Sequence, residues 1–423
     1  MTESETRKLF QGKANQTRFN RVFWIVMDGV GCGAAPDASA YHDDQADTLG
    51  NLSRSFLQKT GKQLELPNLM GLGLSQISQG SFSPATTSTL SHSWRGKAKE
   101  QSAGKDTTSG HWEMAGHIVK KAFQVYPDGF PVHSLNEWVQ KSKIPGFLGN
   151  KPASGTEIIE ELGLESVRSG KPILYTSADS VWQVAAHEQY FGLNNLYRIC
   201  EIAREICDDL GVARVIARPF IGEGTRLQPY KRTYNRKDYA RPPEAPTLLT
   251  LLQDQHIPTK GVGKIASIFG HSGIDLNIDT KGNRDGMQVL LQEASKTSRG
   301  LIYANLIDFD MLYGHRRDVL GFGQELEVFD QELGKFLPKL KHDDVVILTA
   351  DHGNDPTFRG TDHTREYVPV LAWSPSFTSG GRDLGLLESF GDMGASISEM
   401  LLGFRPKELT SFHSFLSAEG PSP

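Results

Sequence analysis

The sequence predicts an α/β protein with a mainly parallel sheet and helices on both faces. Short apolar runs rich in β-branched residues recur along the chain, and segments of helical period alternate with them. Such alternation is typical of parallel strands joined by crossover helices, which cover both faces of the sheet. The length of 423 residues exceeds what one ordinary core accommodates, so we expect a second domain.

The predicted strands are short and apolar, as strands buried on both faces are. The first, RVFWIVM, carries no charge after Arg21. We expect strands over 21–27, 171–177, 213–220, 259–264, 300–309 and 344–350.

The predicted helices lie between these strands. The segment 154–163 opens with Ser154 and Glu157, which have the spacing of a capping box, and it closes on Gly163, a typical helix stop. We expect further helices over 246–255, 325–340 and 395–404.

The stretch 224–246 differs from the rest of the chain. It is basic, aromatic and punctuated by proline, with little apolar periodicity. We therefore expect it to connect two domains rather than to join a core. Acidic and imidazole motifs lie on both sides of it, which predicts that one domain is inserted into the other.

Composition limits the partners and the compartment. The formal net charge is −5 without a dense basic stretch, which argues against nucleic-acid binding, and no apolar run is long enough to span a membrane. The polar start, residues 1–20, lacks the apolar region of a secretory signal, and we expect a mobile extension there. Three widely spaced cysteines, Cys32, Cys200 and Cys207, argue for a reducing, cytoplasmic location. Helical spacing places Cys200 and Cys207 in a core.

Carboxylates and imidazoles gather where three predicted strands end. They are Asp28 after the first strand, Asp308, Asp310 and His315 after the strand that begins at 300, and Asp351, His352 and His363 after the strand that begins at 344. The carboxyl ends of parallel strands meet at one edge of a sheet, where ligands bind. With one carboxylate from the middle pair, three Asp and three His are enough for two metal ions with open positions.

Each of these residues has a plainer explanation when taken alone. Asp28 could cap the following helix, and His315 could lie on the surface. The adjacent pair Asp351 and His352 is harder to explain in this way, because both would crowd one strand end. Buried charges need partners, and oxygen and nitrogen ligands without thiolate suit zinc, manganese or iron(II). The group as a whole predicts a two-metal site.

A run of hydroxyl residues is the candidate nucleophile. Thr107, Thr108 and Ser109 lie between Asp106 and Gly110 in GKDTTSGHWEMAG. A helix cap is the plain explanation. The functional one is a hydroxyl deprotonated beside a metal, since two cations about 4 Å apart favour in-line phosphoryl transfer.

Several stretches then resemble the phosphopentomutase family of the alkaline phosphatase superfamily. They are MDGVGCGAAPDA, GKDTTSGHWEMAG, GNKPASGTEI, YTSADSVWQVAAHE, RVIARPFIGE, NLIDFDMLYGHRRD and TADHGNDPTFRGTDHTREYVP. The motifs match in order and spacing from about Arg21 to the C-terminus, and SADS and HRRD are not general features of the superfamily. The resemblance implies an alkaline-phosphatase-like core over 21–121 and 243–423, with an inserted α+β cap domain over 122–242.

The resemblance also assigns the ligands. One ion would be held by Asp28, Asp351, His352 and the nucleophilic threonine, and the other by Asp310, His315 and His363. The first hydroxyl of the KDT element is the nucleophile of the family, which implies Thr107; the other two hydroxyls stay open from sequence. The family uses two divalent ions, usually manganese.

Four residues are implied as contacts to the sugar phosphate: Ser177, Asp179, Arg214 and Lys264. Each has a plain alternative. Ser177 and Asp179 suit a turn, Arg214 could be a surface strand residue with Arg218 as a rival, and Lys264 could be a solvated strand end.

The implied activity moves phosphate between the C1 and C5 oxygens of ribose or 2-deoxyribose, through a phosphothreonine and a bisphosphate intermediate. A sugar bisphosphate activator follows from that mechanism. The alternatives are a metal-dependent phosphatase or another phosphosugar mutase of the superfamily, and a non-catalytic protein that binds sugar phosphates. The intact ligand set argues against the last of these.

Overall fold

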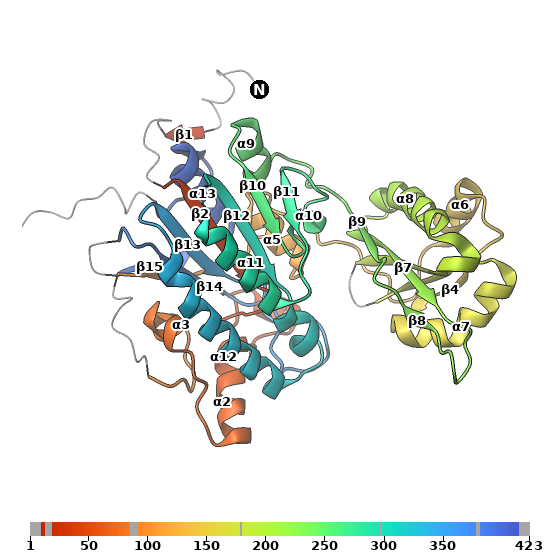
Figure 1. Ribbon diagram of the computed structural model, residues 1–423, viewed down its shortest axis with the longest axis horizontal. Helices are drawn as coiled ribbons and strands as arrows, with labels where there is room; N and C mark the ends of the chain where they lie inside the picture. Colours follow the sequence, from red (N-terminus) through yellow and green to blue (C-terminus); the bar gives the residue numbers. More distant parts are fainter. Residues whose placement is uncertain are drawn as a thin grey trace, which may run out of the picture. The chain divides into compact units, whose positions relative to one another are not determined.

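The chain forms two compact units (Figure 1). A computed structural model describes residues 10–12, 19–84, 92–177, 180–296, 298–377 and 381–413. The core unit comprises Met1–Lys121 and Pro243–Pro423, and the inserted unit is Ala122–Pro242. Among the described residues, no helix has the length and apolar character needed to cross a membrane.

The core unit is built on an eight-stranded sheet in the order β11-β10-β12-β2-β13-β14-β3-β15. Neighbouring strands are parallel, except that β14 runs antiparallel to both β13 and β3. The predicted mainly parallel sheet is therefore confirmed. The strands are β2 (Arg21–Met27), β3 (Trp94–Ala98), β10 (Thr259–Val262), β11 (Leu276–Ile278), β12 (Gly300–Leu306), β13 (Asp344–Thr349), β14 (Val368–Trp373) and β15 (Arg382–Leu387).

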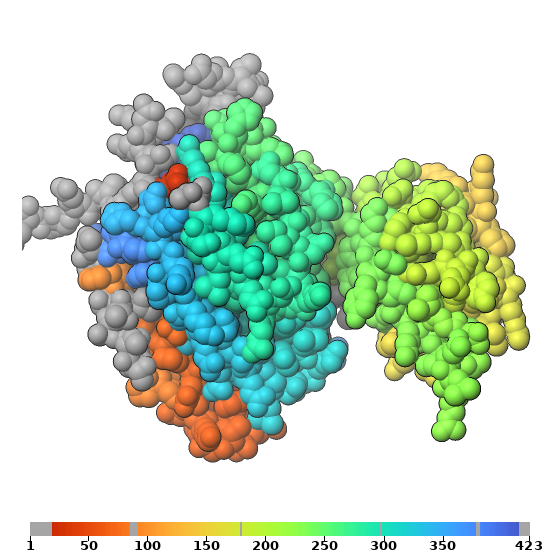
Figure 2. All heavy atoms as spheres, viewed as in Figure 1, coloured from red at the N-terminus to blue at the C-terminus, as the bar shows by residue number. Residues whose placement is uncertain are grey.

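Helices cover both faces of this sheet (Figure 1). One group contains α2 (Thr48–Thr60), α3 (Pro67–Gly71), α11 (Asn283–Ser295) and α12 (Val319–Phe336); Figure 2 shows α11 and α12 side by side on the surface. The other contains α5 (Thr107–Met114), α9 (Leu248–Asp254), α10 (Ile265–Ile268) and α13 (Gly391–Leu402). Shorter elements are η1 (Ala38–Tyr41), α4 (Leu74–Ile77), η4 (Phe309–Gly314), η5 (Leu337–Lys339), β1 (Phe10–Gly12) and β16 (Phe404–Pro406).

A buried ion pair fastens the start of the central strand. Arg21 begins β2, and its guanidinium donates two hydrogen bonds to the Asp344 carboxylate at the start of β13, over 2.8 and 2.6 Å. It also donates to carbonyls at the end of α11, including that of Glu293 at 2.8 Å. One side chain thus ties two strands and a helix together.

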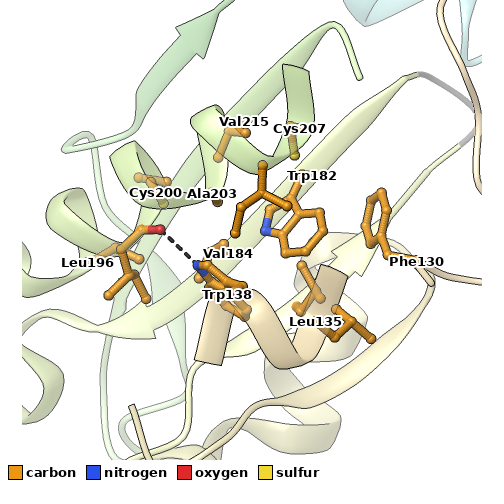
Figure 3. Packing of buried hydrophobic residues seen from close by; sticks show 14 of the residues in the cluster. Phe130, Leu135, Trp138, Trp182, Val184, Leu196, Cys200, Ala203, Cys207 and Val215 are labelled. Carbon is orange, nitrogen blue, oxygen red and sulfur yellow. Dashed lines mark hydrogen bonds between the residues drawn. The ribbon is translucent and has the colours of Figure 1, made fainter. Parts of the chain in front are cut away.

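The inserted unit has its own mixed sheet and its own core. Its strands are β4 (Leu148–Pro152), β5 (Ile173–Thr176), β6 (Val181–His187), β7 (Arg214–Ile221), β8 (Lys231–Arg232) and β9 (Lys237–Ala240), and its helices are α6 (Val132–Ser142), α7 (Gly155–Ser169), η3 (Glu188–Gly192) and α8 (Leu193–Asp209). Figure 3 shows Trp138 and Trp182 in this core. Their rings pack edge to face with centroids 5.4 Å apart, and the Trp138 indole N–H donates to the Ile199 carbonyl. Cys200 and Cys207 are buried there, as predicted.

Two local predictions were wrong because long-range packing overrides local signals. The segment 224–246 is more than a connection, since β8 and β9 within it both pair with β7. Ser154 is the N-cap of α7, but it forms no capping box, and the helix runs past Gly163 to Gly170. A Cβ at Gly163 would lie 2.6 Å from the Tyr230 ring, so this glycine serves close packing.

One predicted strand is shorter in the structure, and part of the N-terminal extension is ordered into a strand. The strand predicted over 300–309 ends at Leu306, where the chain turns into η4. The extension predicted over residues 1–20 falls mostly outside the described residues. Within it, β1 pairs antiparallel with β16, and Phe19 is buried.

Candidate metal centre

Three adjacent parallel strands bring the predicted ligands to one edge of the sheet. In the order β12-β2-β13, β12 leads to Asp310, β2 to Asp28, and β13 to Asp351 and His352. The loop between β13 and β14 adds His363. The geometry follows from parallel pairing, because all three strands end at the same edge.

The first ligand group is Asp28, Asp351 and His352. All three side chains are buried, and one potential ligand atom from each lies within 4.8 Å of the others. His352 Nε2 is 3.4 Å from Asp28 Oδ1 and 3.4 Å from Asp351 Oδ2. Donor atoms this close together could hold one cation.

The second ligand group is Asp310, His315 and His363, with the same 4.8 Å limit. The Asp310 carboxylate lies 3.2 Å from His315 Nε2 and 3.4 Å from His363 Nε2. The rings of His352 and His363 have centroids 4.0 Å apart, so the two groups are adjacent.

Unpaired polar atoms show that these residues fit metal ions. Asp28 Oδ1, Asp351 Oδ2 and His363 Nε2 are buried and have no hydrogen-bond partner. Buried groups of this kind are costly unless a partner is supplied. Because the donors are carboxylate oxygens and imidazole nitrogens, a divalent ion such as manganese or zinc is the suitable partner.

The electrostatics of the first group also favour a cation. Burial, reinforced by the carboxylates of Asp351 and Asp310, raises the pKa of Asp28. Burial opposes charge on His352, yet Asp351 and Asp28 raise the pKa of that imidazole well above its usual value. Negative charge is thus concentrated in a dry site, where a divalent ion would neutralise it.

In the second group, the two imidazoles outweigh the effect of burial on the carboxylate. Burial alone would raise the pKa of Asp310, but His363 and His315 hold it well below its usual range. Asp308, the other member of the pair that sequence left open, is not in either group. Its Oδ2 accepts a hydrogen bond from the Asn283 N–H at the start of α11 over 2.7 Å. The structure therefore places Asp310 among the candidate ligands, whereas Asp308 accepts from the first N–H of α11.

The geometry at the start of α5 separates Thr107 from Ser109. Asp106 is the N-cap: its Oδ1 accepts from the backbone N–H of Thr108 and Ser109, and its Oδ2 accepts from the Ser109 hydroxyl over 2.7 Å. Thr107 Oγ1 instead lies 3.2 Å from His352 Nε2. The Thr107 hydroxyl thus lies beside the ligand groups, whereas the Ser109 hydroxyl binds the N-cap carboxylate.

Sequence reasoning missed several residues that support the ligands. Asn305 Nδ2 donates to Asp28 Oδ2 over 2.9 Å, and Asn354 Nδ2 donates to Asp310 Oδ1 over 2.6 Å. An amide inside the apolar strand GLIYANL was the available signal for Asn305.

Arg317 supports the second group from the HRRD motif. It donates to the Asn354 side chain and to the Gly314 carbonyl, which precedes His315. It also donates to the Asp362 carbonyl, which precedes His363, over 2.8 Å. Its backbone is left-handed, with φ 55°. One guanidinium thus touches the segments that carry all three ligands.

The implied substrate contacts are divided between the units. Ser177 follows β5 and Arg214 begins β7, both half-buried in the inserted unit, while Lys264 lies at the start of α10 in the core unit. Asp179 lies outside the described residues. Arg214 Nη1 is 4.0 Å from Asp238 Oδ2, and burial lowers the pKa of the rival Arg218 to about 10.

Comparison with known proteins first defines the class. The family model of the metalloenzyme superfamily matches residues 20–404, which include every ligand of both groups. Phosphopentomutase from Anaeromyxobacter dehalogenans (strain 2CP-C) is 47% identical over 396 residues, covering 94% of this chain and 98% of that protein. Phosphopentomutase from Anaeromyxobacter sp. (strain K) is 47% identical over 392 residues, covering 93% and 98%. The chain belongs to the phosphopentomutase family, as predicted, and is an enzyme.

Solved structures show more distant similarity. PH0037 protein from Pyrococcus horikoshii is 13% identical with a TM-score of 0.46, covering 90% of this chain and 97% of that one. Phosphoglycerate mutase from Leishmania mexicana is 13% identical with a TM-score of 0.43, covering 95% and 99%.

Proposed function

We propose that the chain interconverts ribose 1-phosphate and ribose 5-phosphate, and the corresponding 2-deoxyribose phosphates. The observation that carries this proposal is the position of Thr107, whose Oγ1 lies 3.2 Å from His352 Nε2 beside the two ligand groups. The 47% identity to proteins named phosphopentomutase supports the same activity.

In the proposed reaction, Thr107 carries the phosphoryl group. Two divalent ions, which we propose to be manganese, would neutralise charge on the phosphate oxygens. The bond between Thr107 Oγ1 and phosphorus breaks as the free hydroxyl of the bound pentose monophosphate bonds to phosphorus and loses its proton, which gives a bisphosphate. The opposite phosphate then returns to Thr107, and the sugar oxygen that it leaves takes up a proton. A sugar bisphosphate activator would supply the first phosphoryl group.

We propose that the inserted unit acts as the cap domain. Ser177, Asp179 and Arg214 from this unit, and Lys264 from the core unit, would contact the sugar phosphate. The guanidinium of Arg214 suits bidentate binding of phosphate. A cytoplasmic location is supported by the odd number of cysteines, of which Cys32 is buried and free.

The test is a product assay with manganese, ribose 1-phosphate and a trace of sugar bisphosphate. We expect ribose 5-phosphate as the main product, and we expect Thr107→Ala to abolish its formation. Predominant free phosphate would favour a phosphatase. Sugar-phosphate binding without any product, unchanged by Thr107→Ala, would favour the non-catalytic relative.

A further inference from the structure

His111 belongs to neither ligand group, yet it contacts both the nucleophile segment and a ligand. It lies one turn after Thr107 on α5 and is fully buried. We propose that His111 is a positioning residue that fixes the Asp351 carboxylate relative to the Thr107 backbone. The proposal rests on the proposed function for what Thr107 does, but not for how the ligands are held.

One ring nitrogen of His111 faces two acceptors. His111 Nδ1 is 2.8 Å from the Thr107 carbonyl oxygen and 3.2 Å from Asp351 Oδ2. Both acceptors lack protons, so Nδ1 is the donor. The Nδ1–H therefore donates to the first residue of α5, and it lies at ion-pair distance from the Asp351 carboxylate at the end of β13.

The other ring nitrogen accepts from an amide that also contacts a ligand. His111 Nε2 is 3.4 Å from Asn305 Nδ2, and the same amide donates to Asp28 Oδ2 over 2.9 Å. An amide has two N–H donors, which match these two directions. Asn305 and His111 together thus link both carboxylates of the first group to the backbone of Thr107.

The helix has little freedom to adjust if this link is lost. A Cβ at Gly110 would lie 2.1 Å from the Asp351 carbonyl oxygen, so α5 packs directly on the backbone of a ligand. The His111 ring also lies beside Tyr303, with centroids 5.8 Å apart. Helix and ligand are in contact, and His111 sets the orientation of the carboxylate.

The test compares two amide variants of similar polarity. His111→Asn places an N–H near the position of Nδ1, so it keeps the donor to the Thr107 carbonyl and an N–H beside the Asp351 carboxylate. His111→Gln places its amide near the position of Nε2, so the Thr107 carbonyl loses its side-chain donor and the Asp351 carboxylate loses the neighbouring N–H. Manganese affinity is measured by calorimetry, turnover by the mutase assay, and folding by the unfolding midpoint of the metal-free proteins.

We expect His111→Gln to weaken manganese binding at the first group by roughly 10- to 100-fold and to lower kcat similarly, with KM little changed. His111→Asn should retain most of the affinity and turnover, although both variants shift the unfolding midpoint. Equal manganese affinity in the wild type and His111→Gln would overturn the proposal, as would equal losses in both variants. Absence of mutase activity in the wild type would refute the proposed function instead, and the manganese measurements would still decide the role of His111.

Discussion

Replacing Asp28 with asparagine should stabilise the metal-free protein and weaken its response to manganese. Asp28 Oδ1 is buried without a hydrogen-bond partner, and burial together with Asp351 and Asp310 raises the pKa of this carboxyl. Asparagine removes the charge and keeps an acceptor for Asn305, which donates over 2.9 Å. The substitution therefore relieves a cost in the empty site while it removes a ligand.

The two effects have different sizes. An unsatisfied buried acceptor costs about 1–3 kcal/mol, and the metal-free variant should gain stability of that order. An ion present at about 1,000 times its dissociation constant stabilises the folded protein by about 4.1 kcal/mol. The variant loses this contribution from the ion at the first group. The order of stability should thus reverse when manganese is added.

The assay is urea unfolding, once with a chelator and once with manganese. Amide hydrogen exchange in peptides of the core unit reports the unfolding of that unit. Asp308→Asn is the matched control, because it makes the same change at a carboxylate outside both ligand groups, which accepts from the first N–H of α11. The control should respond to manganese like the wild type. A variant Asp28→Asn that is less stable than the wild type in chelator would refute the reasoning, as would an unchanged gain on adding manganese.

Three further predictions concern other parts of the core unit. Arg317→Ala should weaken manganese binding at the second ligand group by roughly 10- to 100-fold in calorimetry, because the segments that carry its ligands lose a shared donor; unchanged affinity would contradict this role. Ser109→Ala removes only the hydroxyl bond to the N-cap carboxylate, so it should cost about 0.5–1.5 kcal/mol of stability in urea and leave turnover intact. Loss of turnover as complete as in Thr107→Ala would instead make Ser109 the nucleophile. Asp344→Asn should cost about 3–5 kcal/mol in urea unfolding, because the Arg21 guanidinium stays buried without its counterion; a loss below about 1 kcal/mol would show that the three carbonyl partners suffice.

The convergence of the candidate ligands was largely predictable from sequence, because it follows from topology. Residues that follow parallel strands lie at one edge of the sheet, so polar residues after several apolar strands predict a shared site there. The choice between Asp308 and Asp310 was not predictable from spacing alone, since both follow the same strand. The choice depends on α11, because the first N–H of this helix donates to the Asp308 carboxylate.

The residues that support the ligands could not be predicted from sequence, because their partners are distant in sequence. Asn305 contacts Asp28, which lies more than two hundred residues earlier. His111 offered a weak local signal, a histidine four residues after a candidate nucleophile, but its contact with Asp351 is a property of the fold. The same holds for Gly163: the local sequence predicts a helix stop, but the helix continues and the Tyr230 ring packs against this glycine.

The placement of β2 between β12 and β13 has a consequence for how the chain emerges from the ribosome. β2 ends at Met27, but its first partner begins only at Gly300, after the whole inserted unit. At roughly 5–20 residues per second, the bare apolar strand waits tens of seconds for a neighbour. During that wait the inserted unit, whose sheet pairs only with itself, has time to fold first. We therefore expect chaperones to bind newly made chains chiefly at the exposed segment RVFWIVM.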